Sequence, residues 1–183
     1  MKNLLRYSVL GLLSSVLWFS TGCNLLPEQQ ADPVRHFTLG TLAGVAPAAN
    51  GAQVRPVLLA GHLRNRALAV RVAEHEVIYL EAVNWAEPLD AALTRILRAR
   101  LAATGGGKAV TVEVQRFELV RFEGNRVQLT ATYTVQPVVG GPTAGVFTAS
   151  PRPWDGKDPG VLVGLLRHAA DELGDALAAA GKQ

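Results

Sequence analysis

Residues 110–135 read VTVEVQRFELVRFEGNRVQLTATYTV, and this stretch predicts a β-hairpin. Its second half, residues 126–135, alternates apolar residues with arginine, glutamine and threonine. Such alternation predicts a strand with one buried face and one wet face. Glu-Gly-Asn at positions 123–125 has the composition of a hairpin turn and joins the two halves.

The first half of the stretch, residues 110–120, changes phase along its length. Valines occupy positions 110, 112 and 114, whereas Phe117 and Leu119 follow the opposite phase. One extra residue in this strand brings both sets to the same face of a sheet. We therefore predict a β-bulge near Gln115 and Arg116.

Two amphipathic helices are predicted outside the hairpin. Residues 84–88, Asn-Trp-Ala-Glu-Pro, open the first, because proline is tolerated in the first helical turn. Its apolar stripe comprises Leu89, Leu93, Ile96, Leu97 and Leu101, and the glycines at 105–107 end it. Asp158 as N-cap and Pro159 as first helical residue begin the second. Its stripe comprises Leu162, Leu166, Ala169, Leu173, Ala176 and Ala180.

Shorter apolar runs between polar and glycine-rich segments predict the remaining strands. These runs are residues 35–42, 55–60, 67–72, 77–83 and 145–149. Strands punctuated by two amphipathic helices favour an α+β fold. We therefore expect a single domain over residues 34–183, with a mostly antiparallel β-sheet and both helices packed on one face.

The first residues have the layout of a secretory signal. Lys2 and Arg6 form a basic start, an apolar run covers residues 9–19, and Ser-Thr-Gly-Cys follows at 20–23. As a helix, the apolar run would rise about 16 Å, roughly half of the ~30 Å hydrocarbon layer that a transmembrane span must cross. The sequence therefore predicts export, with a signal peptide at residues 1–22.

Cys23, the only cysteine, follows two small residues and so resembles the modified cysteine of a bacterial lipobox. That resemblance implies a diacylglyceryl thioether and an N-acyl chain on Cys23, which would anchor the protein firmly. An ordinary secreted protein with a free thiol is the alternative. Asn24, in the place where many inner-membrane lipoproteins have aspartate, implies the periplasmic face of the outer membrane, with the inner membrane as alternative. Residues 23–33 are polar and contain Pro27 and Pro33, which suits a flexible linker.

Composition and charge limit the function classes. The chain is 49% apolar and 18% charged, which excludes a disordered protein, and one cysteine excludes a disulfide scaffold. The net charge of +3 includes Lys2 and Arg6 of the leader, so the mature chain is nearly neutral. We therefore expect no nucleic-acid partner.

Catalytic and metal-binding motifs are not found in the sequence. After Cys23 the only serine is Ser150, which lies outside any Gly-x-Ser-x-Gly motif. The histidines are scattered without metal-ligand spacing, at His36, His62, His75 and His168. The Gly-Gly-Gly-Lys run at 105–108 lacks the spacing of a phosphate loop. We expect no catalytic residue, no metal and no cofactor other than the lipid on Cys23.

Two tryptophans are the candidate partner-binding residues. Trp85 lies at a strand-to-helix junction, where it is expected to pack between helix and sheet, with a partner contact as the alternative. Trp154 lies in a proline-flanked loop where periodicity does not predict burial. An aromatic residue on such a loop is a candidate for an interface.

Several segments together are similar to one family. They are the leader with Cys23, Arg-Ala-Leu-Ala-Val-Arg at 66–71, Trp-Ala-Glu-Pro-Leu-Asp at 85–90, Arg-Phe-Glu at 116–118, and the closing Leu/Ala-rich helix. In combination they resemble the ABC-type transport auxiliary lipoproteins, which include the PqiC/YmbA-like group. The segment at 85–90 is the most specific of them.

The resemblance implies a non-enzymatic, periplasm-facing lipoprotein. It would assist a lipid-transport system built around an MCE-domain protein, together with an ABC transporter, and it would self-associate. We expect the protein to tether or dock the transport conduit at the outer membrane. Two alternatives stay open: a lipid-binding carrier module that encloses an acyl chain, and a structural lipoprotein of outer-membrane assembly.

Overall fold

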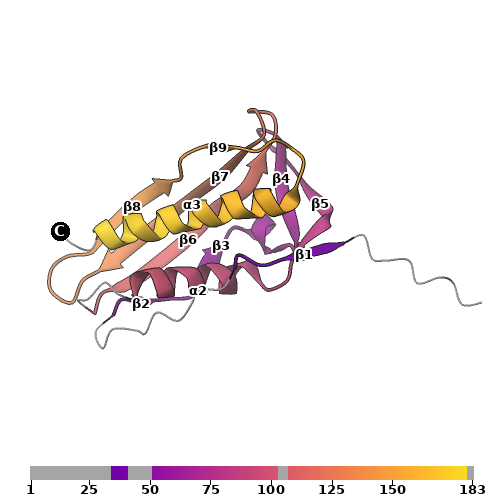
Figure 1. The fold of residues 1–183 in the computed structure, drawn as a ribbon. Coiled ribbons are helices and arrows are strands. Elements are labelled where there is room, and N and C mark those ends of the chain that lie inside the picture. Colours follow the sequence, from indigo (N-terminus) through magenta and orange to yellow (C-terminus); the bar gives the residue numbers. More distant parts are fainter. Residues whose placement is uncertain (1–33, 41–50, 103–106, 181–183) are drawn as a thin grey trace, which may run out of the picture. The chain divides into compact units, whose positions relative to one another are not determined.

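A computed structural model describes residues 34–40, 51–102 and 107–180. These residues form one sheet, two α-helices and one short 3-10 helix (Figure 1). In chain order the elements are β1 (Arg35–Phe37), β2 (Gln53–Val54), β3 (Leu58–Leu59), η2 (Gly61–Arg64), β4 (Ala67–Ala73), β5 (Glu76–Trp85), α2 (Leu89–Leu101), β6 (Ala109–Val120), β7 (Arg126–Gln136), β8 (Thr143–Thr148), β9 (Arg152–Pro153) and α3 (Pro159–Ala180). The predicted signal peptide and linker lie outside the described residues.

The sheet is mixed, with strand order β1-β5-β4-β6-β7-β8. Its longest ladders, β4–β5, β6–β7 and β7–β8, are antiparallel. Shorter parallel ladders join β1 to β5 and join β2, β3 and β4 to β6. Both helices cover the same face of the sheet (Figure 1). The predicted α+β class, with a mostly antiparallel sheet and two helices on one face, is confirmed.

The central hairpin, β6 and β7, confirms both the turn and the bulge. Gly124 and Asn125 have φ angles of 89° and 49°, the left-handed conformations of a tight turn. Val114 pairs with Ala131 and Arg116 with Thr130, so Gln115 is the extra residue. The two apolar phases thereby reach one face, and five side chains of β6 are fully buried there: Val110, Val112, Val114, Phe117 and Leu119.

The bulge also marks the point at which β6 changes its neighbour. Before it, β3 pairs with β6 as far as Val114. Beyond it, β4 pairs with β6 from Leu119 onward. The chain crosses between these two neighbours through η2, and this crossover creates one wall of the site described below.

The helices are close to their predicted positions. The Asp158 carboxylate accepts a hydrogen bond from the Gly160 N–H at 2.9 Å, which confirms the predicted cap of α3. The predicted start of α2 is wrong by several residues, because β5 continues through Trp85 and Pro88 is the N-cap residue. Trp85 stays in the strand because it pairs with two neighbouring segments. Its N–H donates to the Arg66 carbonyl, and it lies opposite Phe37 of β1.

The short strands differ most from the prediction. Of the run at 55–60 only Leu58–Leu59 form a strand, β3, while β2 lies before the run; Pro56, which has no N–H to donate to a ladder, lies between the two strands. Among the described residues 35–40 of the run at 35–42, Arg35–Phe37 form a strand and the next three do not. The strand β9 was not predicted, because it consists of Arg152 and Pro153 next to another proline. Neither helix of the described part combines the length and the hydrophobicity that a membrane span needs.

Candidate functional site

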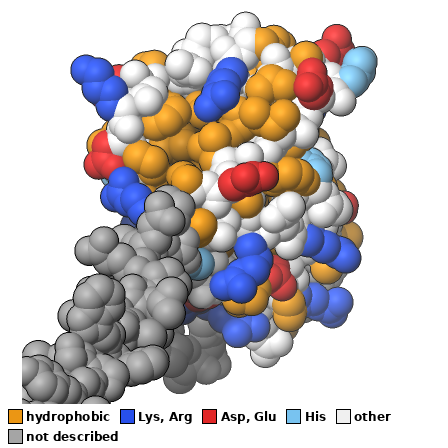
Figure 2. All heavy atoms as spheres, turned by 90° about the vertical axis from the view of Figure 1, so that its right-hand side faces the viewer, with side chains coloured by type: hydrophobic (Ala, Val, Ile, Leu, Met, Phe, Trp, Pro, Cys, Tyr) orange, Lys and Arg blue, Asp and Glu red, His pale blue; other side chains and the backbone are white. Residues whose placement is uncertain are grey.

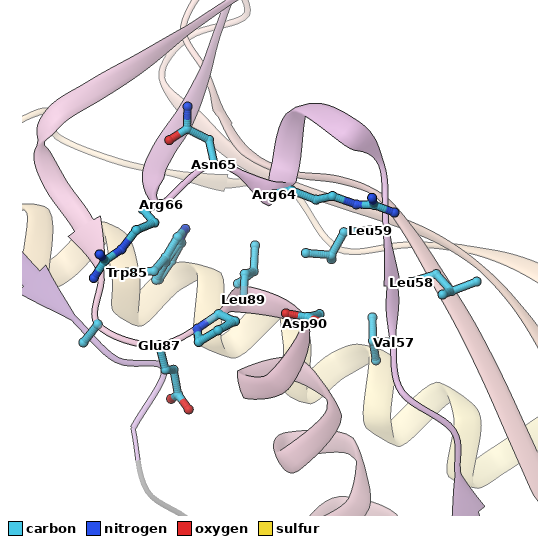
Figure 3. A pocket seen from close by; sticks show the side chains of 12 residues that line it. Val57, Leu58, Leu59, Arg64, Asn65, Arg66, Trp85, Glu87, Leu89 and Asp90 are labelled. Atoms are coloured by element: carbon cyan, nitrogen blue, oxygen red, sulfur yellow. The ribbon is translucent and has the colours of Figure 1, made fainter.

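A cavity of about 620 Å³ lies where β3, η2, the end of β5 and the start of α2 meet (Figure 3). Its volume is within the range of about 300–1,000 Å³ that is usual for ligand pockets. We call it the α2 pocket. Its lining residues are Val57, Leu58, Leu59, Arg64, Asn65, Arg66, Trp85, Ala86, Glu87, Pro88, Leu89 and Asp90. One continuous segment, residues 85–90, supplies half of this lining.

The floor of the α2 pocket is apolar and rigid. Trp85 is buried, and its ring lies 6.0 Å from the ring of Phe117 with the two planes tilted by 43°. Leu59 and Leu89 are also buried. The Ala86 N–H donates to the Phe37 carbonyl at 2.8 Å, which fixes the turn between β5 and α2. These contacts confirm that Trp85 packs between helix and sheet, while its contact with a partner stays a prediction.

Charged side chains stand on opposite rims of the α2 pocket. Arg64 lies on the η2 side and Asp90 on the α2 side, and both are exposed (Figure 3). Within the described residues neither forms an ion pair. Glu87, in contrast, is held by the Arg95 guanidinium, which also donates to the Gly40 carbonyl at 2.8 Å. An apolar floor between rims of opposite charge suits an apolar side chain presented by a partner polypeptide.

A buried ion pair lies between β4 and β6. The Arg71 Nε donates to Glu118 Oε1 at 2.6 Å, and Nη2 donates to Oε2 at 3.3 Å. Glu118 is fully buried. The remaining Arg71 nitrogen donates to the Glu74 carbonyl at 3.0 Å, and His62 Nε2 lies 3.5 Å from Glu118 Oε2. This bidentate geometry locks the crossover segment and β4 onto the centre of the sheet.

The Arg71–Glu118 pair joins two of the segments that carry the family resemblance, at 66–71 and 116–118. Their contact is not predictable from either segment alone. In both segments a charged residue, Arg71 or Glu118, lies within an otherwise apolar strand, and this pattern could have indicated a buried ion pair. The partner could not be assigned, because the bulge at Gln115 and the crossover through η2 decide which residues face each other.

Trp154 corrects an expectation of the sequence analysis. It is only 9% exposed, although periodicity gave no reason to bury it. Its Nε1–H donates to the Asp158 carbonyl at 3.1 Å, and its N–H donates to the Asn125 carbonyl of the central turn at 2.7 Å. The short strand β9 therefore turns Trp154 into the core. Its proposed contact with a partner stays untested.

The other predicted site features are spread over the chain. Cys23 lies outside the described residues. Among residues 34–40, 51–102 and 107–180, no three His, Cys, Asp or Glu side chains are grouped so as to hold a metal ion. Glu87 and Asp90 point to different partners, since Glu87 pairs with Arg95 and Asp90 faces the α2 pocket.

Solved structures with the same fold are known. At 17% sequence identity, a crystal structure of an uncharacterized protein has a TM-score of 0.64 and covers 78% of this chain and 95% of its own. Protein XCC0632 from Xanthomonas campestris, which carries the family designation DUF330, has a TM-score of 0.61 at 14% identity. It covers 80% of this chain and 93% of its own. At these identities the likeness shows the fold.

No curated protein sequence matches the chain. The model of the family described as "ABC-type transport auxiliary lipoprotein component" matches residues 37–178, which include every described strand and helix except the first residues of β1 and the end of α3. The chain therefore belongs to the ABC-type transport auxiliary lipoprotein family.

Proposed function

We propose that this protein is a non-enzymatic periplasmic lipoprotein that docks an MCE-domain lipid-transport conduit at the outer membrane. The observation that carries the proposal is the family match over residues 37–178, which supports an accessory role in ABC-type transport. The lipid on Cys23 would act as the anchor and residues 23–33 as the tether. Such a lipoprotein would keep a conduit that crosses the periplasm close to the membrane, because the lipid anchor and the short tether limit its distance from the bilayer.

The α2 pocket is the part of the surface that we assign to this docking. It is formed by residues 85–90, the most family-like segment of the chain, on a floor fixed by Trp85. Leu58, which is 53% exposed, extends the apolar floor to the rim. An apolar side chain of the MCE-domain protein would enter between Arg64 and Asp90.

The test is recovery of partners with the tagged, full-length protein after cross-linking in cells and gentle solubilisation. We expect mass spectrometry to identify an MCE-domain protein. Leu58→Asp places a carboxylate at the rim without disturbing the core, and we expect it to reduce this recovery at least about tenfold, as a loss of about 1.4 kcal/mol would. Val146→Asp is the matched control, because Val146 is an exposed apolar residue of β8, far along the sheet from the pocket.

Recovery that is equal for Leu58→Asp and Val146→Asp would show that the α2 pocket is not the docking site. Recovery of outer-membrane assembly components in place of an MCE-domain protein would favour the structural alternative.

The lipid-carrier alternative has one observation in its favour, the volume of the α2 pocket. Between the helices and the sheet, however, the facing side chains are buried, including Phe117, Leu93 and Leu166. A carrier would therefore have to hold its lipid in the α2 pocket. Organic extraction of the purified protein followed by mass spectrometry tests this, and one mole of lipid per mole of protein would favour the carrier.

A further inference from the structure

An apolar patch lies at the end of the body where the β4–β5 hairpin, the β6–β7 turn and the start of α3 meet. Figure 2 shows hydrophobic side chains gathered on this side, bordered by charged ones. The exposed members are Ile78 (36% exposed), Phe122 (47%) and Val161 (52%), and Leu80 is half-buried beside them. We call these four residues the tip patch. Hydrophobic side chains that cluster at a surface in this way mark an interaction site.

The topology explains why the helices leave the tip patch uncovered. Ile78 pairs with Val70, and Val70 pairs with Leu119 of β6. Val70 and Leu119 are fully buried on the face that the helices cover, so Ile78 points to that same face. Helix α3 packs mainly on β7, β8 and α2. Ile78 and Leu80 therefore continue the core face of the sheet to its margin, where Ile78 is exposed and Leu80 is only half-buried.

The chain enters the folded body beside the tip patch. β1 begins at Arg35, whose Nη1 lies 3.4 Å from the Asp158 carboxylate at the start of α3. Val161 follows Asp158 by less than one helical turn, and its N–H donates to the Asp158 carbonyl. Arg35 itself pairs with Val83 of β5, five residues along that strand from Ile78. The predicted tether joins the described part at Val34, next to the start of α3.

The length of the tether limits how the body can stand on its membrane. The eleven or so residues from Cys23 to Val34 span at most about 37 Å when fully extended. A body of this size has a radius of gyration of about 15 Å. A flexible tether of eleven residues spans on average only about 18 Å, close to the radius of the body, so the side on which Val34 lies is most often nearest to the bilayer, and that side includes Val161 of the tip patch.

Charges around the tip patch carry both signs. Exposed residues of both signs stand on the same elements: Glu76 at the start of β5, Arg121 after β6, and Asp155 and Lys157 before α3, while Arg35 is paired with Asp158. A mixed border of this kind provides no net attraction to anionic headgroups. Contact with a bilayer at this place would depend on the apolar side chains, as it does for interfacial anchors.

We propose that the tip patch rests on the surface of the bilayer in which Cys23 is anchored, and so fixes the orientation of the folded body. This inference rests on the proposed acylation of Cys23. It also has a consequence for docking: Ile78 lies near the start of β5 and Trp85 at its end, about 23 Å further along the strand. With the tip patch on the membrane, the orientation of the α2 pocket relative to the bilayer is fixed as well.

The experiment uses the acylated, full-length protein in phospholipid vesicles. Since Cys23 is the only cysteine and carries the lipid, a cysteine introduced by Ile78→Cys takes up an environment-sensitive fluorophore at a single place. Val146→Cys is the matched control, because Val146 is 69% exposed on β8, at the sheet edge opposite β1. Some vesicles carry lipids with a nitroxide quencher on the acyl chain.

We expect both labelled proteins to float with the vesicles. The fluorophore at position 78 should shift to the blue and be quenched several-fold more by the nitroxide lipids than the one at position 146. Because the contact is apolar, this quenching should not change between about 0.05 and 0.5 M salt, although the Debye length falls severalfold over that range.

Each failure has its own signature. Equal quenching at positions 78 and 146 in floating protein overturns the inference and leaves the anchor intact. A blue shift at position 78 without quenching by lipid overturns it as well, because a second copy or another protein then covers the tip patch. Protein that does not float with the vesicles lacks the anchor, and the proposed acylation fails together with the inference.

Discussion

At the scale of single residues, the Arg71–Glu118 pair is the interaction with the largest expected effect on stability. Glu118 is fully buried and its carboxylate oxygens are held by Nε and Nη2 of Arg71. The attraction within such a pair roughly balances the cost of removing both charges from water. Removal of one partner is different, because the other charge is then buried without compensation.

Arg71→Met is therefore expected to destabilise the protein by about 3–5 kcal/mol. The double variant Arg71→Met/Glu118→Leu should regain most of that loss, because no buried charge remains. Urea unfolding of the purified variants measures both effects. Arg64→Ala serves as the control: Arg64 is exposed, and its loss should change the free energy of unfolding by at most about 0.5 kcal/mol. A double variant no more stable than Arg71→Met would show that the two charges are not energetically coupled.

At the scale of elements, two carboxylates fasten α3 to the rest of the fold. Asp175 accepts hydrogen bonds from Arg100 of α2, at 2.8 and 2.9 Å, and these lower the pKa of Asp175 below its ordinary value of 3.8. Burial alone would raise the pKa of Glu172. Hydrogen bonds from Arg152 and from the Ser150 N–H outweigh burial, so that the pKa of Glu172 lies below its ordinary value of 4.5.

Both pKa values are lower in the folded state than in the unfolded chain, which gives the pH dependence its sign. The stabilisation is fully present above the ordinary carboxyl pKa values and is lost as the pH falls through the lowered ones. Asp175 is mostly exposed, so solvent screening limits its share to about 0.5 kcal/mol. Asp175→Asn should therefore lower stability slightly near neutral pH and reduce the loss of stability on acidification.

Thermal unfolding followed from pH 7 to pH 3 measures this effect. Asp155→Asn is a suitable control, since Asp155 is an exposed loop residue whose carboxylate accepts a hydrogen bond only from the nearby Lys157 N–H. If the pH profiles of Asp175→Asn and the unaltered protein run parallel, the link between α2 and α3 has no role in acid stability.

Local patterns predicted the long elements and missed the contacts between distant segments. The bulge at Gln115 could be predicted because two clear apolar phases meet there within one strand. The extension of β5 through Trp85 could not, because it depends on pairing with Phe37, which lies nearly fifty residues earlier in the chain. The α2 pocket is composed of three such segments, residues 57–59, 64–66 and 85–90. Residues 85–90 were singled out from the sequence, whereas Leu58 and Arg64 join them only through the crossover at η2.

At the scale of the whole molecule, three parts would have successive roles: the lipid on Cys23 attaches the protein to the membrane, the tip patch orients the body, and the α2 pocket binds the partner. The tip patch has only a few exposed apolar side chains, so its own affinity for a bilayer is weak. Attachment to the membrane through Cys23 converts that weak contact into an intramolecular one. The length of the tether then determines how often the tip patch touches the bilayer, and thereby how firmly the α2 pocket is oriented.

A longer tether should therefore weaken the contact without detaching the protein. About thirty Gly and Ser residues inserted between Pro33 and Val34 would extend the tether nearly fourfold, and the effective concentration of the tip patch at the membrane should fall about sevenfold. We expect the lipid-dependent quenching at position 78 to decrease markedly while flotation with vesicles is unchanged, because the lipid on Cys23 is untouched. The fluorophore at position 146 should be quenched only weakly by the nitroxide lipids, both with the original tether and with the extended one. Unchanged quenching at position 78 in the extended protein would mean that the tip patch binds the bilayer by its own affinity, and the tether would then have no part in orienting the body.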